Sequence, residues 1–279
     1  MNASGSTLRS FRDTSSAGVS PVFLGILTAW AVSGWFCWTA DFDTTKAKYS
    51  VFAFVFIGWI ASLCVHEFSH ARAALWGGDD SVVGRGYLTL NPMRYLHPGL
   101  SLVLPLVFLA IGGVGLPGGA VWINRAAIRD KRRQSLMSLA GPGSNLVMGM
   151  ALASVVRLMN LTIDNRVVFG SALSYLAVLQ FIAAILNLLP VPGLDGFGAI
   201  EPFLSRETLI KLAPVRQYGI FILFFLSFRF PLFSDLVFGN ADSLAELFGV
   251  PGLGDAFRGD FNLGDLGRLI FRSVITLTS

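Results

Sequence analysis

Charged residues are scarce in this sequence, and their scarcity excludes a soluble globular protein. They make up 14% of the 279 residues, while hydrophobic residues make up 53%. Soluble domains carry about 25% charged residues. Cysteine is rarer still, and because Cys37 and Cys64 both lie in apolar stretches, the sequence offers no disulfide framework. This composition is typical of a membrane protein.

The long hydrophobic runs predict how the chain crosses the membrane. A helix needs about 20 apolar residues to span a bilayer, and five stretches reach that length. They lie near residues 21–40, 51–75, 136–156, 169–190 and 218–238. A sixth stretch, 100–116, is shorter and is interrupted by Pro105 and two consecutive glycines, so we expect it to be re-entrant. The sequence therefore predicts an all-α polytopic membrane protein with five or six transmembrane helices.

The flanks of these stretches divide the chain into three parts. We expect a polar N-terminal tail over 1–20, a membrane-embedded domain over 21–238 and a C-terminal tail over 239–279. Within this last tail, residues 264–277 have apolar side chains at helical spacing beside two arginines, which predicts an interfacial helix. A helix packed in the bundle would show the same pattern.

Two of the three histidines, His66 and His70, lie inside the second apolar stretch in the motif HEFSH. On a helix, histidines four residues apart share one face and can bind one ion. Zinc accepts neutral imidazole and makes water acidic, and Glu67 can take the proton and deliver it to a leaving amine. Two polar residues that merely hydrogen-bond within a bundle are the alternative. Ionisable residues at the bilayer centre cost about 2.5–3.5 kcal/mol, which favours a functional site.

A catalytic zinc site usually has three protein ligands, and the sequence offers few candidates for the third. His97 lies in a polar loop next to a proline, where a solvated histidine is ordinary. Asp79 and Asp80 lie in GGDDS, which indicates a hydrated loop. Asp195 differs from these because it follows an apolar run within NLLPVPGLDGFG, whose prolines and glycines prevent a regular helix. Broken backbone near a membrane persists only where it is buried in protein or lines water.

Three motifs together resemble the site-2 proteases, a family of intramembrane zinc metalloproteases. HEFSH at 66–70, SLAGPGSNL at 138–146 and NLLPVPGLDG at 187–196 follow one another in the family's order. GRGYLTLNP at 84–92 is similar to the stretch after the metal helix in compact bacterial members, which lack a PDZ domain. The resemblance covers about residues 51–235.

The resemblance implies a role for particular residues. Asp195 would be the third zinc ligand beside His66 and His70, with Glu67 as the catalytic base and acid. Asn187 matches an asparagine that assists the substrate or the oxyanion, although an amide that packs helices together is an equal alternative.

Topology has to agree with the metal, because ligands about 2 Å from one ion must come from the same depth of the membrane. The number of crossings between His70 and Asp195 must therefore be even, and a re-entrant 100–116 makes it so. The same choice places most basic residues on one side, which should be cytosolic. They are Arg72, Arg85, Arg94, Arg125, Arg129, Lys131, Arg132, Arg133, Arg206, Lys211 and Arg216.

We therefore expect a multi-pass protein of the cell membrane with its active site near the cytosolic leaflet. The net charge of +4 reflects this positive-inside arrangement, so we expect no nucleic-acid partner. The small residues of 136–156, among them Gly141, Gly143 and Gly149, should allow close helix packing.

A transmembrane substrate hides its peptide bonds in helical hydrogen bonds and must be unwound before cleavage. Residues 84–90, GRGYLTL, predict a short β element next to the metal helix. The unwound substrate could add to it as a strand, with Tyr87 and Thr89 as contacts. A structural hairpin is the alternative.

The predicted function is regulated cleavage of membrane-spanning or membrane-anchored proteins by a Zn²⁺ enzyme in the lipid bilayer. A non-proteolytic scaffold or chaperone with a structural metal site is the main alternative, but such a site has no need for Glu67. A metal or proton transporter is a third reading, although the sequence contains only one intramembrane polar cluster.

Overall fold

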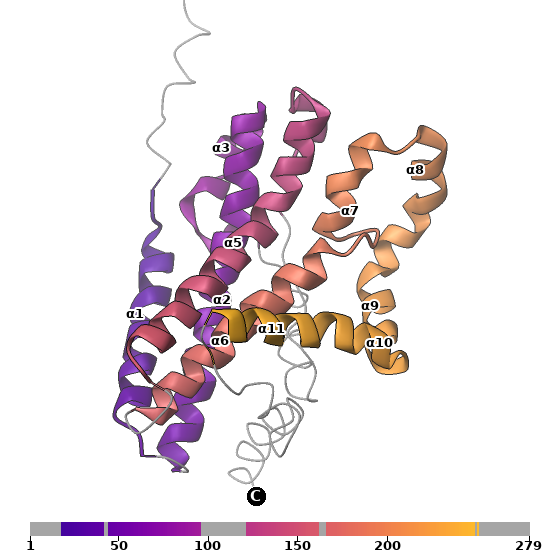
Figure 1. Ribbon diagram of the computed structural model, residues 1–279. Coiled ribbons are helices and arrows are strands. Elements are labelled where there is room, and N and C mark those ends of the chain that lie inside the picture. The colour runs from indigo at the N-terminus through magenta and orange to yellow at the C-terminus, as the bar shows by residue number, and fades with distance from the viewer. Residues whose placement is uncertain (1–17, 42–43, 96–120, 162–165, 249, 251–279) are drawn as a thin grey trace, which may run out of the picture.

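The computed structural model describes residues 18–41, 44–95, 121–161, 166–248 and 250. Across these residues the protein is a bundle of helices without a strand (Figure 1). The expected all-α fold is confirmed for these residues. The re-entrant segment 100–116, His97 and the predicted interfacial helix at 264–277 lie outside the described residues.

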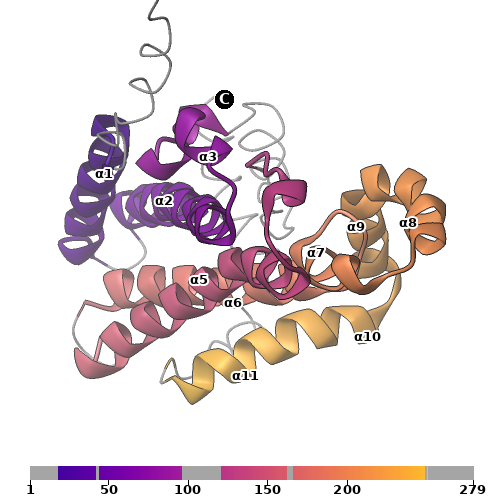
Figure 2. The same cartoon turned by 90° about the horizontal axis from the view of Figure 1, so that it is seen from above.

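Four helices of the described part are long and apolar enough to span a membrane. They are α1 (Pro21–Trp38), α2 (Thr45–Gly77), α5 (Lys131–Leu158) and α6 (Val167–Leu188). Figure 2 shows α1 and α2 on one side of the bundle and α5 and α6 beside them. α2 packs against α1, α5 and α6, and most residues of α6 are buried. The helices α2, α5 and α6 therefore form the centre of the bundle.

Side-chain caps fix where three of these helices begin. Ser20 Oγ accepts the N–H of Phe23 at 3.1 Å at the start of α1, and Thr44 caps α2 in the same way. Asp130 Oδ1 accepts the N–H of Arg133 at 2.9 Å at the start of α5. Each cap satisfies a donor that has no partner within its helix.

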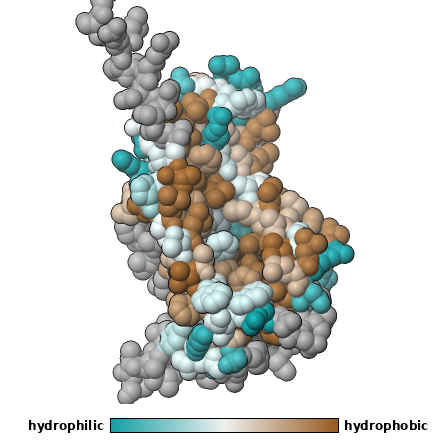
Figure 3. All heavy atoms as spheres, turned by 90° about the vertical axis from the view of Figure 1, so that its left-hand side faces the viewer, coloured by the Kyte–Doolittle hydropathy of each residue, from teal (hydrophilic) through white to brown (hydrophobic). Residues whose placement is uncertain are grey.

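The outer surface of α1 fits a lipid environment. Large apolar side chains are exposed along this helix, namely Val22, Leu24, Val32, Trp35 and Phe36. In Figure 3 hydrophobic side chains fill the middle of one face and hydrophilic ones gather toward its two ends. An apolar band between polar ends is the surface expected of a membrane protein.

The fifth predicted span, 218–238, is not one helix, and that prediction is wrong. α9 (Gly219–Arg229) stops at Phe230, which has extended dihedral angles because Pro231 follows it. At about 1.5 Å per residue, an 11-residue helix is too short for a bilayer core of about 30 Å. The described residues thus contain four candidate spans rather than five or six.

After Pro231 the chain turns and runs across the bundle (Figures 1 and 2). It forms α10 (Pro231–Ser234), a π-helical turn at Asp235–Gly239 and α11 (Asn240–Leu247). α11 packs on α6, and the rings of Phe181 and Phe248 stack with centroids 6.3 Å apart. Residues assigned to the C-terminal tail thus contribute to the packed bundle, while the division into three parts stays a prediction.

The predicted β element at 84–90 is also wrong. This stretch consists of the end of α3 (Ser81–Gly84) and a 3₁₀ turn, η2 (Tyr87–Thr89). Gly86 and Leu90 have φ values of 71° and 55°, so the backbone reverses at both ends of the turn instead of extending. The Thr89 hydroxyl donates to the Gly86 carbonyl at 2.7 Å and closes the turn.

Shorter helical elements connect the long ones at the end of the bundle that contains α7. They are η3 (Pro92–Arg94), η5 (Arg125–Ala127), α7 (Asp195–Ile200), η6 (Glu201–Phe203), α8 (Arg206–Leu212) and η7 (Ala213–Tyr218). α7 packs against α5 and α6.

Candidate metal centre

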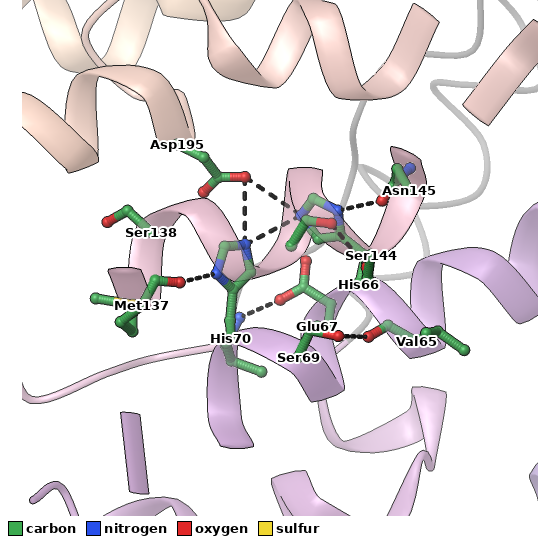
Figure 4. Close-up of polar contacts among 12 residues, drawn as sticks. Val65, His66, Glu67, Ser69, His70, Met137, Ser138, Ser144, Asn145 and Asp195 are labelled. Atoms are coloured by element: carbon green, nitrogen blue, oxygen red, sulfur yellow. Dashed lines mark hydrogen bonds and ion pairs between the residues drawn. The ribbon is translucent and has the colours of Figure 1, made fainter. Parts of the chain in front are cut away.

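Three potential ligands converge between α2 and α7 (Figure 4). His66 Nε2 and His70 Nε2 are 3.1 Å apart, and Asp195 Oδ2 lies 3.3 Å from the first and 3.2 Å from the second. A tetrahedral zinc ion with bonds of about 2.0–2.1 Å holds its ligand atoms about 3.3 Å apart. The three side chains therefore fit a zinc ion without rearrangement.

The helix directions explain how residues so far apart in sequence meet. His66 and His70 lie in the C-terminal half of α2, four residues apart on one face. α5 then leads away from that end of the bundle and α6 leads back to it (Figure 1). Asp195 consequently returns to the end where the histidines lie, as the even-crossing argument requires.

A tight turn after α6 aims Asp195 at the histidines. The Leu194 N–H donates to the Val191 carbonyl at 3.0 Å, and Gly193 has φ of 103°, which side chains rarely tolerate. Asp195 is the first residue of α7. Burial alone raises the pKa of its carboxyl group, but the His70 and His66 rings lower that pKa by more. Metals bind a carboxyl group in its deprotonated form.

Gly141 of α5 forms one wall of the site. A Cβ atom at this position would collide with His70 Nε2 and lie 2.5 Å from His66 Nε2, where the ion has to fit. A Cβ on Gly143, one residue beyond Pro142, would meet nothing within 4 Å. Gly149 shows the expected packing role, since its Cβ would meet the Phe181 ring. Gly141 thus does more than permit helix packing, because it keeps the space between the potential ligands open.

Each imidazole is oriented through its second nitrogen. His70 Nδ1 lies 2.7 Å from the Met137 carbonyl oxygen, which can only accept, so Nδ1 carries the proton. His66 Nδ1 lies 2.7 Å from the side-chain oxygen of Asn145. Hydrogen bonds of this kind fix the ring orientation and leave Nε2 free to bind a metal.

Glu67 is buried beside the two histidines, and Figure 4 shows its carboxylate between them. Its Oε2 accepts the backbone N–H of Val121 at 2.9 Å. Three residues further on, the N–H of Asn124 donates to Asp79 Oδ2 at 2.7 Å. Two carboxylates next to the histidines of α2 thus hold residues 121–124, ahead of α5.

Charged side chains fasten α7 to α5. The Arg125 guanidinium donates to the Gly198 carbonyl at 3.0 Å and to Ser138 Oγ at 3.1 Å. It also pairs with Glu201 Oε2 at 3.3 Å, and the other oxygen of Glu201 pairs with Arg216. This Arg125–Glu201–Arg216 network holds the helix that begins with Asp195.

Other residues singled out from the sequence have different surroundings. Asn187 is buried near the end of α6, and its catalytic role stays a prediction. Tyr87 is buried against Tyr95, with ring centroids 6.5 Å apart, and the Thr89 carbonyl accepts the N–H of Ser20. Their role in substrate binding also stays a prediction, without the strand on which it was based. Asp79 is buried and bonded to Ser81 and the loop before α5, which makes it structural.

Sequence reasoning missed Asn145, Gln180 and Arg125 as parts of the site. Gln180 could have been found, because an amide in the middle of an apolar stretch is costly in a membrane. Asn145 lies within the motif SLAGPGSNL and Arg125 among many basic residues, so neither stands out in the sequence. Their contacts depend on how α2, α5, α6 and α7 pack, which the sequence does not reveal.

Comparison with known proteins agrees with this chemistry. The chain is 46% identical to "Putative zinc metalloprotease Rip2" of Mycobacterium tuberculosis strain H37Rv over 83% of this chain and 88% of the relative. For the protein of the same name in Mycolicibacterium smegmatis the identity is 46%, over 73% and 78% of the two chains. "Putative zinc metalloprotease YwhC" of Bacillus subtilis is 31% identical over 71% and 92%. No protein-family model and no solved structure matches the chain. The relatives and the grouped donors agree on zinc as the cofactor.

Proposed function

Because the chain belongs to the site-2 protease family of zinc metalloproteases, we propose that it cleaves membrane-spanning or membrane-anchored proteins as an intramembrane zinc metalloendopeptidase. The observation that carries this proposal is the meeting of His66, His70 and Asp195 with Glu67 beside them. A purely structural metal site needs the three ligands but no general base beside them.

In this proposal, His66, His70 and Asp195 hold the zinc ion. When bound there, zinc supplies Lewis-acid chemistry that polarises a carbonyl group and makes water acidic enough to lose a proton near neutral pH. Glu67 takes that proton as the general base and passes it to the leaving amine as the general acid. Asn187 is proposed to assist by donating from its amide to the carbonyl oxygen on which charge develops.

The arrangement of charge supports a multi-pass protein of the cell membrane with the zinc end toward the cytosol. Basic residues gather at the end of the bundle where α2 ends and α5 begins, among them Arg129, Lys131, Arg132 and Arg133. Cytoplasmic loops carry such an excess of Lys and Arg. A site between membrane-spanning helices would receive substrates that lie in the bilayer, which favours a transmembrane protein as the substrate.

The test is cleavage of a panel of single-span reporter proteins reconstituted with the purified protein in liposomes. We expect the parent to bind zinc and cleave at least one reporter. Glu67→Gln should keep the zinc and lose about 10²- to 10⁴-fold in cleavage rate, the usual contribution of a general base. Zinc in both proteins with cleavage by neither would instead favour the scaffold reading.

A further inference from the structure

A line of buried polar side chains leads away from His66 into the middle of the bundle. Asn145 on α5 accepts from His66 through Oδ1 and donates through Nδ2 to Gln180 Oε1 at 3.1 Å. Gln180 on α6 donates through Nε2 to Ser62 Oγ at 3.0 Å. Ser62 on α2 donates to the Trp59 carbonyl at 2.8 Å. We call these three side chains, Asn145, Gln180 and Ser62, the relay.

The far end of the relay determines the direction of every hydrogen bond in it. The Trp59 carbonyl can only accept, so the single Ser62 proton points at it and a Ser62 lone pair faces Gln180. Gln180 therefore presents its NH₂ group to Ser62 and its oxygen to Asn145. Asn145 must then present its NH₂ group to Gln180 and its oxygen to His66, whose Nδ1 consequently carries the proton.

This direction matters because a neutral imidazole has two tautomers and only one can bind zinc through Nε2. An Asn145 side chain turned the other way would present its NH₂ group to Nδ1. It would thereby favour the proton on Nε2, where it blocks the metal. Asn145 alone fits either way round, since its oxygen and nitrogen ends have nearly the same shape. The choice between the two depends on Gln180.

We propose that Gln180 is a positioning residue that keeps His66 in the zinc-binding tautomer by fixing which way Asn145 faces. The proposal rests on the assignment of His66 as a zinc ligand. Gln180 is fully buried, and its hydrogen-bond partners are Asn145 and Ser62, so it acts on His66 through Asn145. Loss of an outer hydrogen-bond partner of a metal ligand typically costs about 10- to 100-fold in metal affinity.

Two substitutions at Gln180 distinguish the effect of hydrogen-bond direction from the effect of side-chain packing. Gln180→Met keeps the length and fills the space but removes both hydrogen bonds, so we expect zinc affinity to fall about 10- to 100-fold. In Gln180→Glu, a buried and neutral carboxylic acid donates its proton to Ser62 and accepts from Asn145. It preserves the direction of the relay and should stay within about threefold of the parent. Ser174→Ala, a buried position on the same helix, is the control for altering α6.

A double substitution distinguishes the relay from ordinary interhelical packing. An aspartate at position 145 can only accept from His66 Nδ1, whichever way it faces. In the Asn145→Asp background, His66 therefore no longer depends on Gln180, and adding Gln180→Met should change zinc affinity less than threefold. A merely structural Gln180 would cost the same in both backgrounds.

The measurement is zinc affinity by competition with a chromophoric chelator, on detergent-purified protein whose helix content matches the parent. The absorption spectrum of the cobalt-substituted protein reports the ligand set in the same samples. The proposal is overturned if Gln180→Met binds zinc as tightly as Ser174→Ala, or if its loss persists in the Asn145→Asp background. Either result leaves the proposed function standing as long as the parent binds zinc and cleaves a reporter. If the parent protein neither binds zinc nor cleaves a reporter, the proposed function is refuted instead.

Discussion

His66 and His70 lie on α2, one of the long central helices, and are held by neutral groups, whereas Asp195 lies on the short helix α7, which is held by charged groups. The histidine partners are an amide and a main-chain carbonyl. α7, which begins with Asp195, is fastened by the Arg125–Glu201–Arg216 network, and the Arg216 side chain is half exposed. The two sides of the candidate metal site are thus held by different kinds of interaction.

The difference follows from the surroundings. Between membrane-spanning helices a charge is costly to bury, while a neutral network with every donor and acceptor satisfied is not. At the polar end of the bundle, water lowers the cost of burying charge, and the Arg125 guanidinium can reach several acceptors at once. We therefore expect the histidine side to respond to changes of shape and hydrogen bonding, and the aspartate side to respond to salt.

The largest effect should come from a change that disturbs both histidines at once. Gly141→Ala would place a methyl group against both Nε2 atoms, so we expect zinc affinity to fall by more than about 100-fold, beyond the usual cost of losing an outer partner. Gly143→Ala lies in the same motif and helix and meets nothing within 4 Å. It should bind zinc like the parent. Equal zinc affinity in the two variants, measured by chelator competition, would refute this role of Gly141.

An intermediate effect is expected on the aspartate side alone. Glu201→Gln keeps the shape but removes the charge that pairs with Arg125 and Arg216. The loss of one charge-assisted interaction, roughly 1.5 kcal/mol, corresponds to about a 10-fold weaker zinc affinity.

The salt dependence of zinc affinity distinguishes the loss in Glu201→Gln from a loss on the histidine side. The Debye length falls from about 10 Å at 0.1 M salt to about 3 Å at 1 M. The ratio of zinc affinities between parent and Glu201→Gln should therefore shrink at high salt, while the ratio between parent and Gln180→Met stays constant. Two ratios with the same salt dependence would contradict the comparison.

The sequence predicted the parts of this site that depend on local spacing. HEFSH determines which face of α2 presents the two imidazoles, and NLLPVPGLDG marks where the chain breaks after α6. The resemblance to the site-2 proteases implied Asp195 as the third ligand, and a shared ion then required an even number of crossings between His70 and Asp195. The relay could not be predicted in this way, because Asn145 and Gln180 become neighbours only through the packing of α5 on α6.

Both differences from the predicted fold arise at proline or glycine residues that interrupt regular backbone. Pro231 stands inside the predicted fifth span and ends α9 at Phe230. Gly84 and Gly86 interrupt the stretch predicted as a strand, and the backbone at Gly86 is left-handed. In each case the apolar or alternating pattern predicted one regular element, and a proline or glycine within it ended that element.

The smallest effect is expected at Met137, although it lies as close to a ligand as Asn145 does. His70 is oriented by the main-chain carbonyl of Met137, which no side-chain substitution removes. Met137→Leu roughly conserves volume and should leave zinc affinity within about twofold of the parent. Asn145→Leu takes away the acceptor of His66 and should cost about 10- to 100-fold. A loss at Met137→Leu as large as that at Asn145→Leu would mean that the side chain, and not the backbone, orients His70.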